Sequence, residues 1–283
     1  MPTFETPEPI DAHIEVGSGR FVINAADRTD TTVDVIPQDP GRDADVQAAE
    51  QIRVEYAAGR LSVRAPRNTL RSLIGRPGMA DVTIALPAGS RVDVNAASGD
   101  IRCEGALGRS TFRTAAGSVR LDRAAGTRVR TSTGNVAVGR SSEHTDVATS
   151  TGKIWIGAAE GSVVAKTSNG DITVGEAGGD LRLTTANGDI TIDRALATVA
   201  AKTAYGSIRV GEVARGTVHL ETNFGELELG IAEGTAAWLD ADSKHGAVRS
   251  ELQAVDNPHP GDQRVEVRAR TGFGDIVVHR RPS

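Results

Sequence analysis

The sequence predicts an all-β fold: a β-solenoid of about ten two-stranded rungs, each of about 18 residues, behind an N-terminal β-rich cap. Three observations lead to this prediction. A glycine recurs about every 18 residues, apolar residues alternate with polar ones on both sides of it, and the chain has 32 glycines but only 3% aromatic residues. Fixed spacing is typical of repeat architectures, and a core of Val, Ile and Thr favours strands over helices.

The first 90 residues alternate in polarity without following the period. We expect strands at Ala12–Val16, Phe21–Ala25, Thr32–Ile36, Arg53–Ala57, Arg60–Ala65 and Asp81–Leu86, a helix at Asp43–Glu50 and a loop at Arg67–Gly78. An open solenoid end exposes a sheet edge, so residues 1–90 are predicted to cap the first rung. The Gly17-Ser18-Gly19 stretch lacks the third glycine and the helix of a dinucleotide-binding loop, and it predicts a hairpin turn.

The repeat region spans residues 91–283. Its anchoring turn glycines are Gly99, Gly117, Gly134, Gly152, Gly170, Gly188, Gly206, Gly225, Gly246 and Gly274. In the rung around Gly170, inward positions Val163, Ala165 and Thr167 precede the glycine, and Ile172 and Val174 follow it. A period of two indicates strands, and Asn-Gly is a strong turn signal because both residues tolerate positive φ. Each rung is therefore a strand ending in Thr, a tight turn, a second strand and a looser corner.

Equivalent positions should form ladders when rungs stack. One ladder is the inward threonine column of Thr114, Thr131, Thr149, Thr167, Thr185, Thr203, Thr222 and Thr271. A second is the buried corner column of Ala106, Ala124, Ala159, Ala177, Ala195 and Ala232. A single rung buries about five aliphatic side chains, worth roughly 1.5–3 kcal/mol each, which is less than the cost of ordering it. The rungs must therefore stack, and the fixed register favours parallel stacking over a sandwich of hairpins.

The chain ends on a rung that follows a predicted loop at Asp256–Asp262. Its inward residues Val265, Val267, Ile276 and Val278 are expected at the open end of the stack.

The segment Asp81-Val-Thr-Ile-Ala-Leu-Pro-Ala-Gly-Ser-Arg-Val-Asp-Val, leading into Ser-Gly-Asp-Ile and its repeats, resembles the DUF4097 family of bacterial β-strand repeat proteins, often labelled "putative adhesins". The closing Val265-Glu-Val-Arg-Ala-Arg-Thr-Gly-Phe-Gly-Asp-Ile-Val-Val resembles the ends of family members, and the likeness covers about residues 10–280. The resemblance implies a β-solenoid and supplies no catalytic residues.

Composition excludes several classes of function. A net charge of −5 and a pI near 5.7 give no global reason to bind nucleic acid or an anionic membrane. The single cysteine, Cys103, excludes an internal disulfide and a Cys-based zinc site and is expected in the core, and the six histidines share no ladder position. We therefore expect no metal, no cofactor and no catalytic residues. Without an export signal or a long apolar run, a cytoplasmic protein that does not insert into membranes is expected.

An acidic column runs beside the turns through Asp100, Asp171, Asp189, Glu226 and Asp275. A calcium-binding β-roll requires glycine motifs in both halves of each turn, and only one half carries the glycine here. The column is therefore interpreted as turn solvation.

Basic residues recur at outward positions of the first strand: Arg113, Arg128, Arg130, Lys166, Arg182 and Lys202. We hypothesise that this column and the outward Trp155 form a partner-binding face, and that Trp238 marks a second contact. Exposed sheet faces also carry Lys and Arg to discourage aggregation, so a solvated face is the alternative interpretation.

The function predicted is a non-catalytic, adhesin-like scaffold or protein-interaction module, whose partner is a protein or another copy bound through end or face contacts. One alternative is a self-assembling structural rod, in which the last rung meets another end. A solenoid polysaccharide-active enzyme is a further alternative, although rungs of about 18 residues leave little room for a catalytic cleft.

Overall fold

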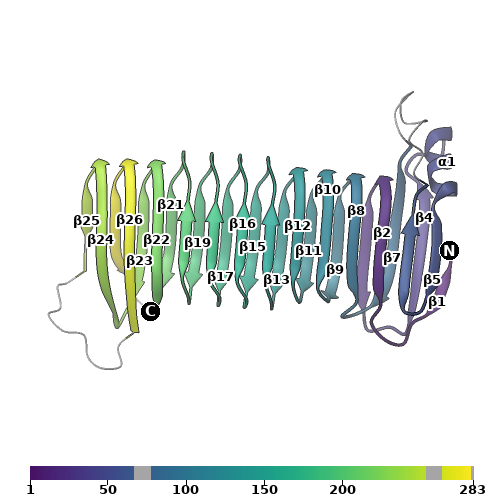
Figure 1. Cartoon of the computed structure of the whole chain (residues 1–283), viewed down its shortest axis with the longest axis horizontal. Coiled ribbons are helices and arrows are strands. Elements are labelled where there is room, and N and C mark those ends of the chain that lie inside the picture. The colour runs from purple at the N-terminus through teal and green to yellow at the C-terminus, as the bar shows by residue number, and fades with distance from the viewer. Residues whose placement is uncertain (67–77, 253–262, 282–283) are drawn as a thin grey trace. The chain divides into compact units, whose positions relative to one another are not determined.

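A computed structural model describes residues 1–66, 78–252 and 263–281 of the chain. The chain forms two compact units, Met1–Arg140 and Ser141–Ser283. In each unit the chain passes back and forth between two sheets, so that every rung contributes one strand to sheet B and the next to sheet A (Figure 1). This confirms the predicted β-solenoid. The predicted loops at 67–78 and 256–262 lie outside the described residues, apart from Gly78.

Sheet strands of the first unit stack in an order that departs from the sequence. Sheet A has the order β1 (Thr3–Glu5), β4 (Asp30–Pro37), β7 (Ala80–Pro87), β3 (Phe21–Ala26), β9 (Ile101–Leu107), β11 (Val119–Ala124) and β13 (Val136–Ser141). Sheet B has the order β12 (Thr127–Thr133), β10 (Ser110–Ala116), β8 (Arg91–Ser98), β2 (Asp11–Ser18), β6 (Arg60–Arg64) and β5 (Arg53–Ala57).

Antiparallel strands close both sheets of the first unit, β1 and β4 in sheet A and β5 in sheet B. The helix α1 (Asp43–Gln51) lies against β4 and β7. Its buried Asp45 carboxylate accepts hydrogen bonds from the amides of Met79, at 2.9 Å, and Asp39, at 3.2 Å. All the strands predicted for this region and the helix are confirmed, with bounds that differ by at most two residues.

One part of the predicted cap is a full rung. β2 lies between β6 and β8, and β3 lies between β7 and β9, with every pairing parallel. Gly19 joins these two strands across the sheets, so the expectation of a hairpin at Gly17–Gly19 is wrong. Gly19 takes the place of the turn glycine of later rungs, and the buried Val16 takes the place of the column threonine.

The second unit repeats the parallel pattern in register. Sheet A has the order β15 (Ile154–Ala159), β17 (Ile172–Ala177), β19 (Ile190–Ala195), β21 (Ile208–Val213), β23 (Leu227–Ala232), β27 (Ile276–Arg281) and β25 (Val248–Ser250). Sheet B has the order β14 (Thr145–Ala148), β16 (Val163–Lys166), β18 (Leu181–Thr184), β20 (Val199–Lys202), β22 (Gly216–Phe224), β26 (Gln263–Phe273) and β24 (Thr235–His245). Ile172, for example, pairs with Ile154 on one side and Ile190 on the other.

Side-chain hydrogen bonds that recur in several rungs hold the turns. Gly188 has φ of +148°, and a Cβ there would collide with the carbonyl oxygen of Gly170 in the preceding rung. The Thr185 hydroxyl donates to that carbonyl oxygen at 3.0 Å, and Asp171 Oδ1 accepts the amide of Asp189 at 3.1 Å. The predicted threonine column is buried throughout. All the predicted turn glycines except Gly246 have φ between +138° and +153°.

The buried corner column is confirmed at Ala124, Ala159, Ala177 and Ala195. It is wrong at Ala106 and Ala232, which are only partly buried. The register shifts by one residue against β9 and β23, so that Leu107 and Ile231 fill the column there.

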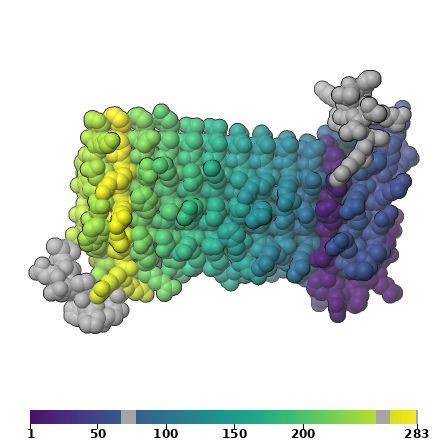
Figure 2. All heavy atoms as spheres, in the orientation of Figure 1, coloured from purple at the N-terminus to yellow at the C-terminus, as the bar shows by residue number. Residues whose placement is uncertain are grey.

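The C-terminal rung is not at the end of the stack. β26 lies between β22 and β24, and β27 lies between β23 and β25. Figure 2 shows this insertion as a yellow band between green rungs of lower residue number. Val265, Val267, Ile276 and Val278 are at most 2% exposed, so their predicted place at an open end is wrong.

The outer rung of the described residues is instead β24 with β25, where Val248 is 45% exposed. This rung carries Ser250 at the position where β27 has Val278. Burial of the more aliphatic rung on both sides removes more apolar surface from water, which accounts for the exchanged order.

Candidate functional site: an arginine-rich sheet face

The described residues offer few groups for chemistry. No cluster of three or more His, Cys, Asp or Glu side chains in this part of the chain could hold a metal ion. Cys103 is buried as predicted, and burial raises the pKa of its thiol far above the usual range, so it is a poor nucleophile. No helix among the described residues is both long enough and apolar enough to span a membrane. The exposed faces are therefore the candidate sites.

Arginines gather on the outer face of sheet B in the first unit. Alternate residues of a strand stand on one face of a sheet, and parallel register places equivalent residues side by side. Seven arginines stand at outward positions of the neighbouring strands β6, β2, β8, β10 and β12, or directly before β10. We call them the arginine face: Arg60, Arg64, Arg91, Arg109, Arg113, Arg128 and Arg130. Only Asp11, Glu15 and Asp93 oppose them there. Seven arginines against three carboxylates leave a formal excess of four positive charges, on a chain whose net charge is −5.

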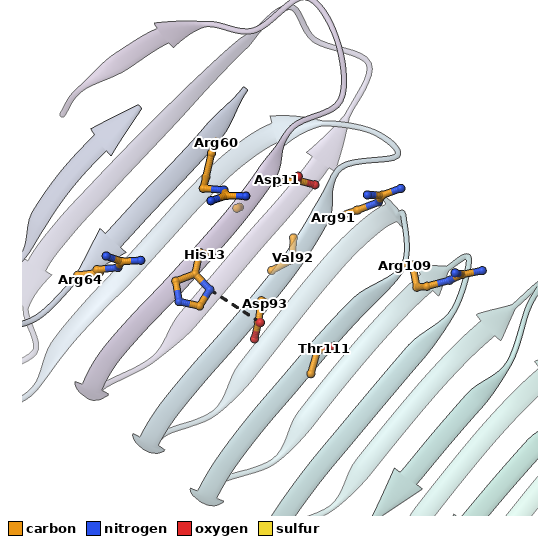
Figure 3. A pocket seen from close by; sticks show the side chains of 10 residues that line it. Asp11, His13, Arg60, Arg64, Arg91, Val92, Asp93, Arg109 and Thr111 are labelled. Atoms are coloured by element: carbon orange, nitrogen blue, oxygen red, sulfur yellow. Dashed lines mark ion pairs between the residues drawn. The ribbon is translucent and has the colours of Figure 1, made fainter. Parts of the chain in front are cut away.

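A shallow hollow of about 390 Å³ lies on this face. In Figure 3 the side chains of Arg60, Arg64, Arg91 and Arg109 stand around it, with His13 between them. The strand register explains the arrangement, because Asp11 of β2 pairs with Arg60 on one side and Arg91 on the other. Four guanidinium groups at the rim make the hollow attractive to anionic groups.

Asp93 is the carboxylate nearest the middle of the arginine face. Its Oδ2 lies 3.8 Å from His13 Nδ1, and its Oδ1 lies 3.3 Å from Arg113 Nη1. The Asp93 side chain is 44% exposed, so these ion pairs are screened by water and are weak. They orient His13 and Arg113 without neutralising the face.

A second hollow of about 360 Å³ adjoins Arg113 and Arg130, which pair in register on β10 and β12. Its wall is completed by Asn95, Thr131 and Ser132. The Arg130 Nη1 donates to the carbonyl oxygen of Val129 at 3.0 Å, which fixes one end of its side chain. Two like charges held side by side at the strand spacing favour an anion that contacts both.

The structure brings Arg113, Arg128 and Arg130 together within the first unit. Lys166, Arg182 and Lys202 belong to β16, β18 and β20 of the second unit. There Lys166 and Lys202 share a row through Thr184, whereas Arg182 lies two residues earlier in its strand. Lys202 Nζ contacts Glu221 Oε1 at 2.8 Å.

Trp155 is exposed as predicted, at 47%, but it lies on β15 of sheet A beside Thr173. Lys166, Arg182 and Lys202 lie on sheet B, and the outer faces of the two sheets of a solenoid point in opposite directions. The prediction that Trp155 shares a face with the basic column is therefore wrong. Trp238, 57% exposed, lies on β24 in the outer rung.

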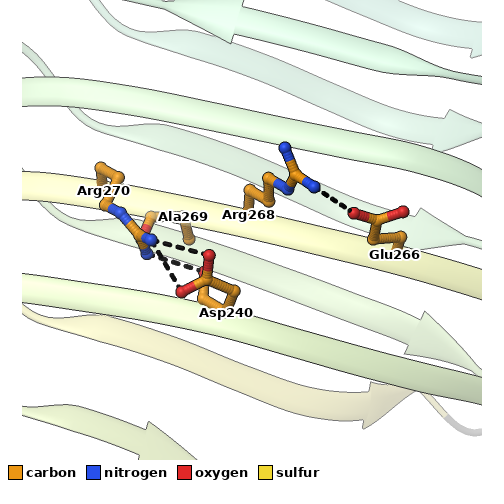
Figure 4. A network of polar contacts seen from close by, with 5 residues as sticks. All are labelled: Asp240, Glu266, Arg268, Ala269 and Arg270. Atoms are coloured by element: carbon orange, nitrogen blue, oxygen red, sulfur yellow. Dashed lines mark hydrogen bonds and ion pairs between the residues drawn. The ribbon is translucent and has the colours of Figure 1, made fainter.

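Two other basic residues of sheet B in the second unit are paired with carboxylates. Arg270 Nη2 donates to both carboxylate oxygens of Asp240 at 2.7 Å, and Arg268 Nη2 lies 2.8 Å from Glu266 Oε1 (Figure 4). In contrast, among the described residues, Arg60, Arg64 and Arg91 of the first unit form no ion pair. Arg60, Arg64 and Arg91 are thus the arginines of this face that no carboxylate of the described residues pairs with.

Sequence reasoning missed Arg60, Arg64, Arg91 and Arg109. A signal was present for two of them, because Arg91 and Arg109 are separated by the 18-residue period and hold the same offset in their rungs. No such signal exists for Arg60 and Arg64, which lie in the aperiodic region. Their place on the face follows only from the pairing of β6 with β2.

The model of a family described as Toastrack DUF4097 matches residues 12–215. Solved structures similar to the chain include a "putative adhesin" from Parabacteroides merdae, with 10% identity, coverage of 99% of this chain and 95% of that one, and a TM-score of 0.37. A "putative cell adhesion protein" from Clostridium sporogenes has 12% identity, coverage of 99% and 98%, and a TM-score of 0.27. A "putative lipid binding protein" from Parabacteroides distasonis has 14% identity, coverage of 99% and 96%, and a TM-score of 0.34. No curated protein matches the chain.

Proposed function

The chain belongs to the Toastrack DUF4097 family, and from this premise we propose that it is a non-catalytic, adhesin-like interaction module whose arginine face binds an acidic surface of a partner protein. The observation that carries the proposal is the excess of four positive charges on one sheet face of an otherwise acidic chain. A charge distribution of this kind steers oppositely charged partners and selects among them.

The rigidity of the sheet supports binding at this face. Neighbouring strands stay about 4.8 Å apart, so the backbone positions that carry Arg113 and Arg130 keep a fixed spacing before a partner arrives. Preorganisation lowers the entropy lost on binding. Arginine also suits the task, because its planar fork can donate two parallel hydrogen bonds to one carboxylate.

A protein partner fits this face better than a nucleic acid. Neither hollow is lined by a Phe, Tyr or Trp side chain, and His13 is the one ring among their lining residues on which a base could stack. The net charge of −5 opposes the approach of a long polyanion, whereas a compact acidic patch can contact the face alone. The shallow form of both hollows favours binding over catalysis.

The test uses the double variant Arg91→Gln/Arg113→Gln and a fluorescent poly-glutamate peptide as the probe. An exposed ion pair is worth about 0.2–1 kcal/mol, so loss of two should raise the Kd of the peptide roughly 2- to 30-fold at low salt. Anisotropy titrations across a range of salt concentrations measure this, and the wild-type affinity should fall as salt increases.

The matched control is Arg102→Gln/Arg120→Gln, which removes two register-paired arginines from sheet A of the same unit. Each double variant changes the net charge of the chain equally. The Kd of the control variant should nevertheless stay within about twofold of the wild-type value, because its arginines lie on the other sheet. Equal weakening by both variants would assign the binding to net charge alone, and the arginine face would lose its proposed role.

A further inference from the structure

The C-terminal rung of the second unit, β26 (Gln263–Phe273) with β27 (Ile276–Arg281), occupies a slot between two rungs that precede it in the sequence. One wall of the slot is β22 with β23, and the other is β24 with β25. Non-covalent contacts with both walls hold the rung in the slot.

Aromatic rings cross the slot in one exposed stack. The ring centroid of Phe273 lies 4.8 Å from that of Phe224 on one wall and 4.4 Å from that of His245 on the other, and the interplanar angles are 1° and 15°. Tyr205 extends the stack beyond Phe224 at 5.0 Å. Parallel, closely spaced rings of this kind each add to the stability of the stack.

Hydrogen bonds also cross both boundaries of the slot. The Thr271 hydroxyl donates to the Gly225 carbonyl oxygen at 3.0 Å, and the Ser243 hydroxyl donates to the Gly274 carbonyl oxygen at 2.8 Å. Arg270 binds the Asp240 carboxylate through both of its oxygens. The walls are thus complementary to this segment at ring, turn and charged positions alike.

The two walls are also compatible with each other. Phe224 and His245 occupy the positions on either side of Phe273, and Leu227 and Val248 occupy those on either side of Ile276. If the C-terminal rung left the slot, Phe224 could pair with His245 and Leu227 with Val248 in the same register. Departure of the C-terminal rung therefore need not unfold the rungs around it.

We propose that the C-terminal rung exchanges between two copies of this chain, so that residues 263–281 of one copy fill the slot of the other. The fit of the occupant is already given by the segment in its own slot, because a second copy supplies the same side chains in the same register. Reciprocal exchange of an identical element forms a closed dimer at small energetic cost. This proposal does not rest on the arginine face.

A pair of engineered cysteines tests the exchange. His219 of β22 and Arg268 of β26 are register partners with exposed side chains, so His219→Cys/Arg268→Cys should form a disulfide across the slot boundary. The protein is partly unfolded in denaturant, refolded at concentrations about a hundredfold apart, separated by size with light scattering, oxidised and run on a non-reducing gel. The native Cys103 is buried and should not interfere.

We expect monomers with an internal disulfide at low concentration. At high concentration we expect dimers joined by disulfides between chains, with the dimer fraction rising several-fold. The control pair Ala200→Cys/His219→Cys joins β20 to β22, which are continuous in one chain, and its bonds should stay within the chain in every fraction. Dimers in which the engineered β22-to-β26 disulfide lies within one chain would overturn the proposal, as would the lack of any dimer.

A second measurement guards against variants that fail to fold. Wild-type chains of two sizes, one with a terminal tag, are mixed and taken through the same unfolding and refolding. Mixed dimers should form only after refolding and should persist on dilution. A mixed species that dissociates at once on dilution would indicate simple surface contact and would exclude exchange.

Discussion

Replacement of Thr185 by valine tests whether the threonine column is held by its hydroxyl groups or only by its shape. Thr185 is 3% exposed, and its Oγ1 donates to the carbonyl oxygen of Gly170 at 3.0 Å. Valine keeps the branched shape and the strand preference but removes the donor. The same hydroxyl-to-glycine bond recurs at Thr167, Thr203 and Thr222, so one substitution examines a general feature of the rung.

The expected magnitude follows from what the substitution leaves behind. A buried carbonyl without its donor costs about 1–3 kcal/mol. The turn lies at the edge of the sheets, where water replaces part of the lost interaction, so the lower half of that range is expected. We predict that Thr185→Val lowers the free energy of unfolding by about 1–2 kcal/mol.

Equilibrium unfolding in urea measures this effect as a lower transition midpoint with an unchanged slope. The control is Thr173→Val on β17, an outward threonine that has no side-chain hydrogen bond among the described residues, and it should stay within about 0.5 kcal/mol of the wild type. A midpoint for Thr185→Val equal to that of Thr173→Val would refute the reasoning, and the column would then be a packing feature only.

Two further predictions concern the same turns. Gly188→Ala should destabilise the second unit by more than about 1 kcal/mol, because φ is +148° and the new Cβ meets the Gly170 carbonyl; thermal unfolding close to that of the wild type would contradict it. The ammonium group of Lys153, 3.0 Å from Asp171, and the amide of Asp189 lower the pKa of Asp171 below its ordinary value of 3.8. The stability that the ionised Asp171 contributes is present above the ordinary pKa and is lost as the pH falls through the lower pKa of the folded state. Asp171→Asn should therefore make the melting temperature fall less steeply on the acid side of a plot against pH. A plot for the variant that runs parallel to that of the wild type would argue against this.

The rungs themselves could be predicted from the sequence because their pattern is local. Each rung combines a turn glycine at a position with no room for a Cβ, a threonine that donates to a carbonyl oxygen, and two inward aliphatic residues. These residues lie within about ten positions of each other, and the pattern repeats. The rung around Gly170 has the strands, turn and burial that its residues predict. Local signals of this kind need no knowledge of which rung lies next.

The order of the rungs could not be predicted in the same way. Rungs with the same inward pattern can replace one another as neighbours. The local sequence therefore does not tell whether β22 pairs with β24 or with β26. The choice depends on the total apolar area that each arrangement buries, which is a non-local quantity. For the same reason, the insertion of β2 between β6 and β8 has no sequence signal.

Three of the seven arginines of the arginine face were predicted from the sequence. Period two identified Arg113, Arg128 and Arg130 as outward, and the structure places them on one face. The error with Trp155 arose because outward positions of the two strands in a rung face opposite directions, so that equal exposure does not mean a shared surface. Assigning each strand to its sheet before grouping outward residues would have separated Trp155 from the arginines.

The acidic column shows which charges are available for binding and which are not. Asp100, Asp189 and Asp275 each accept a backbone amide of the neighbouring rung at 2.8–2.9 Å, and the Ser207 hydroxyl accepts the amide of Glu226 at 3.1 Å. These side chains complete the hydrogen bonding that the glycine turns interrupt, as expected for turn solvation. Acidic charge is therefore tied to the turns by the demands of the fold, whereas outward strand positions are constrained only by solubility. An excess of one charge at such positions, as on the arginine face, has no structural requirement behind it, and this is the reason to look there for the partner.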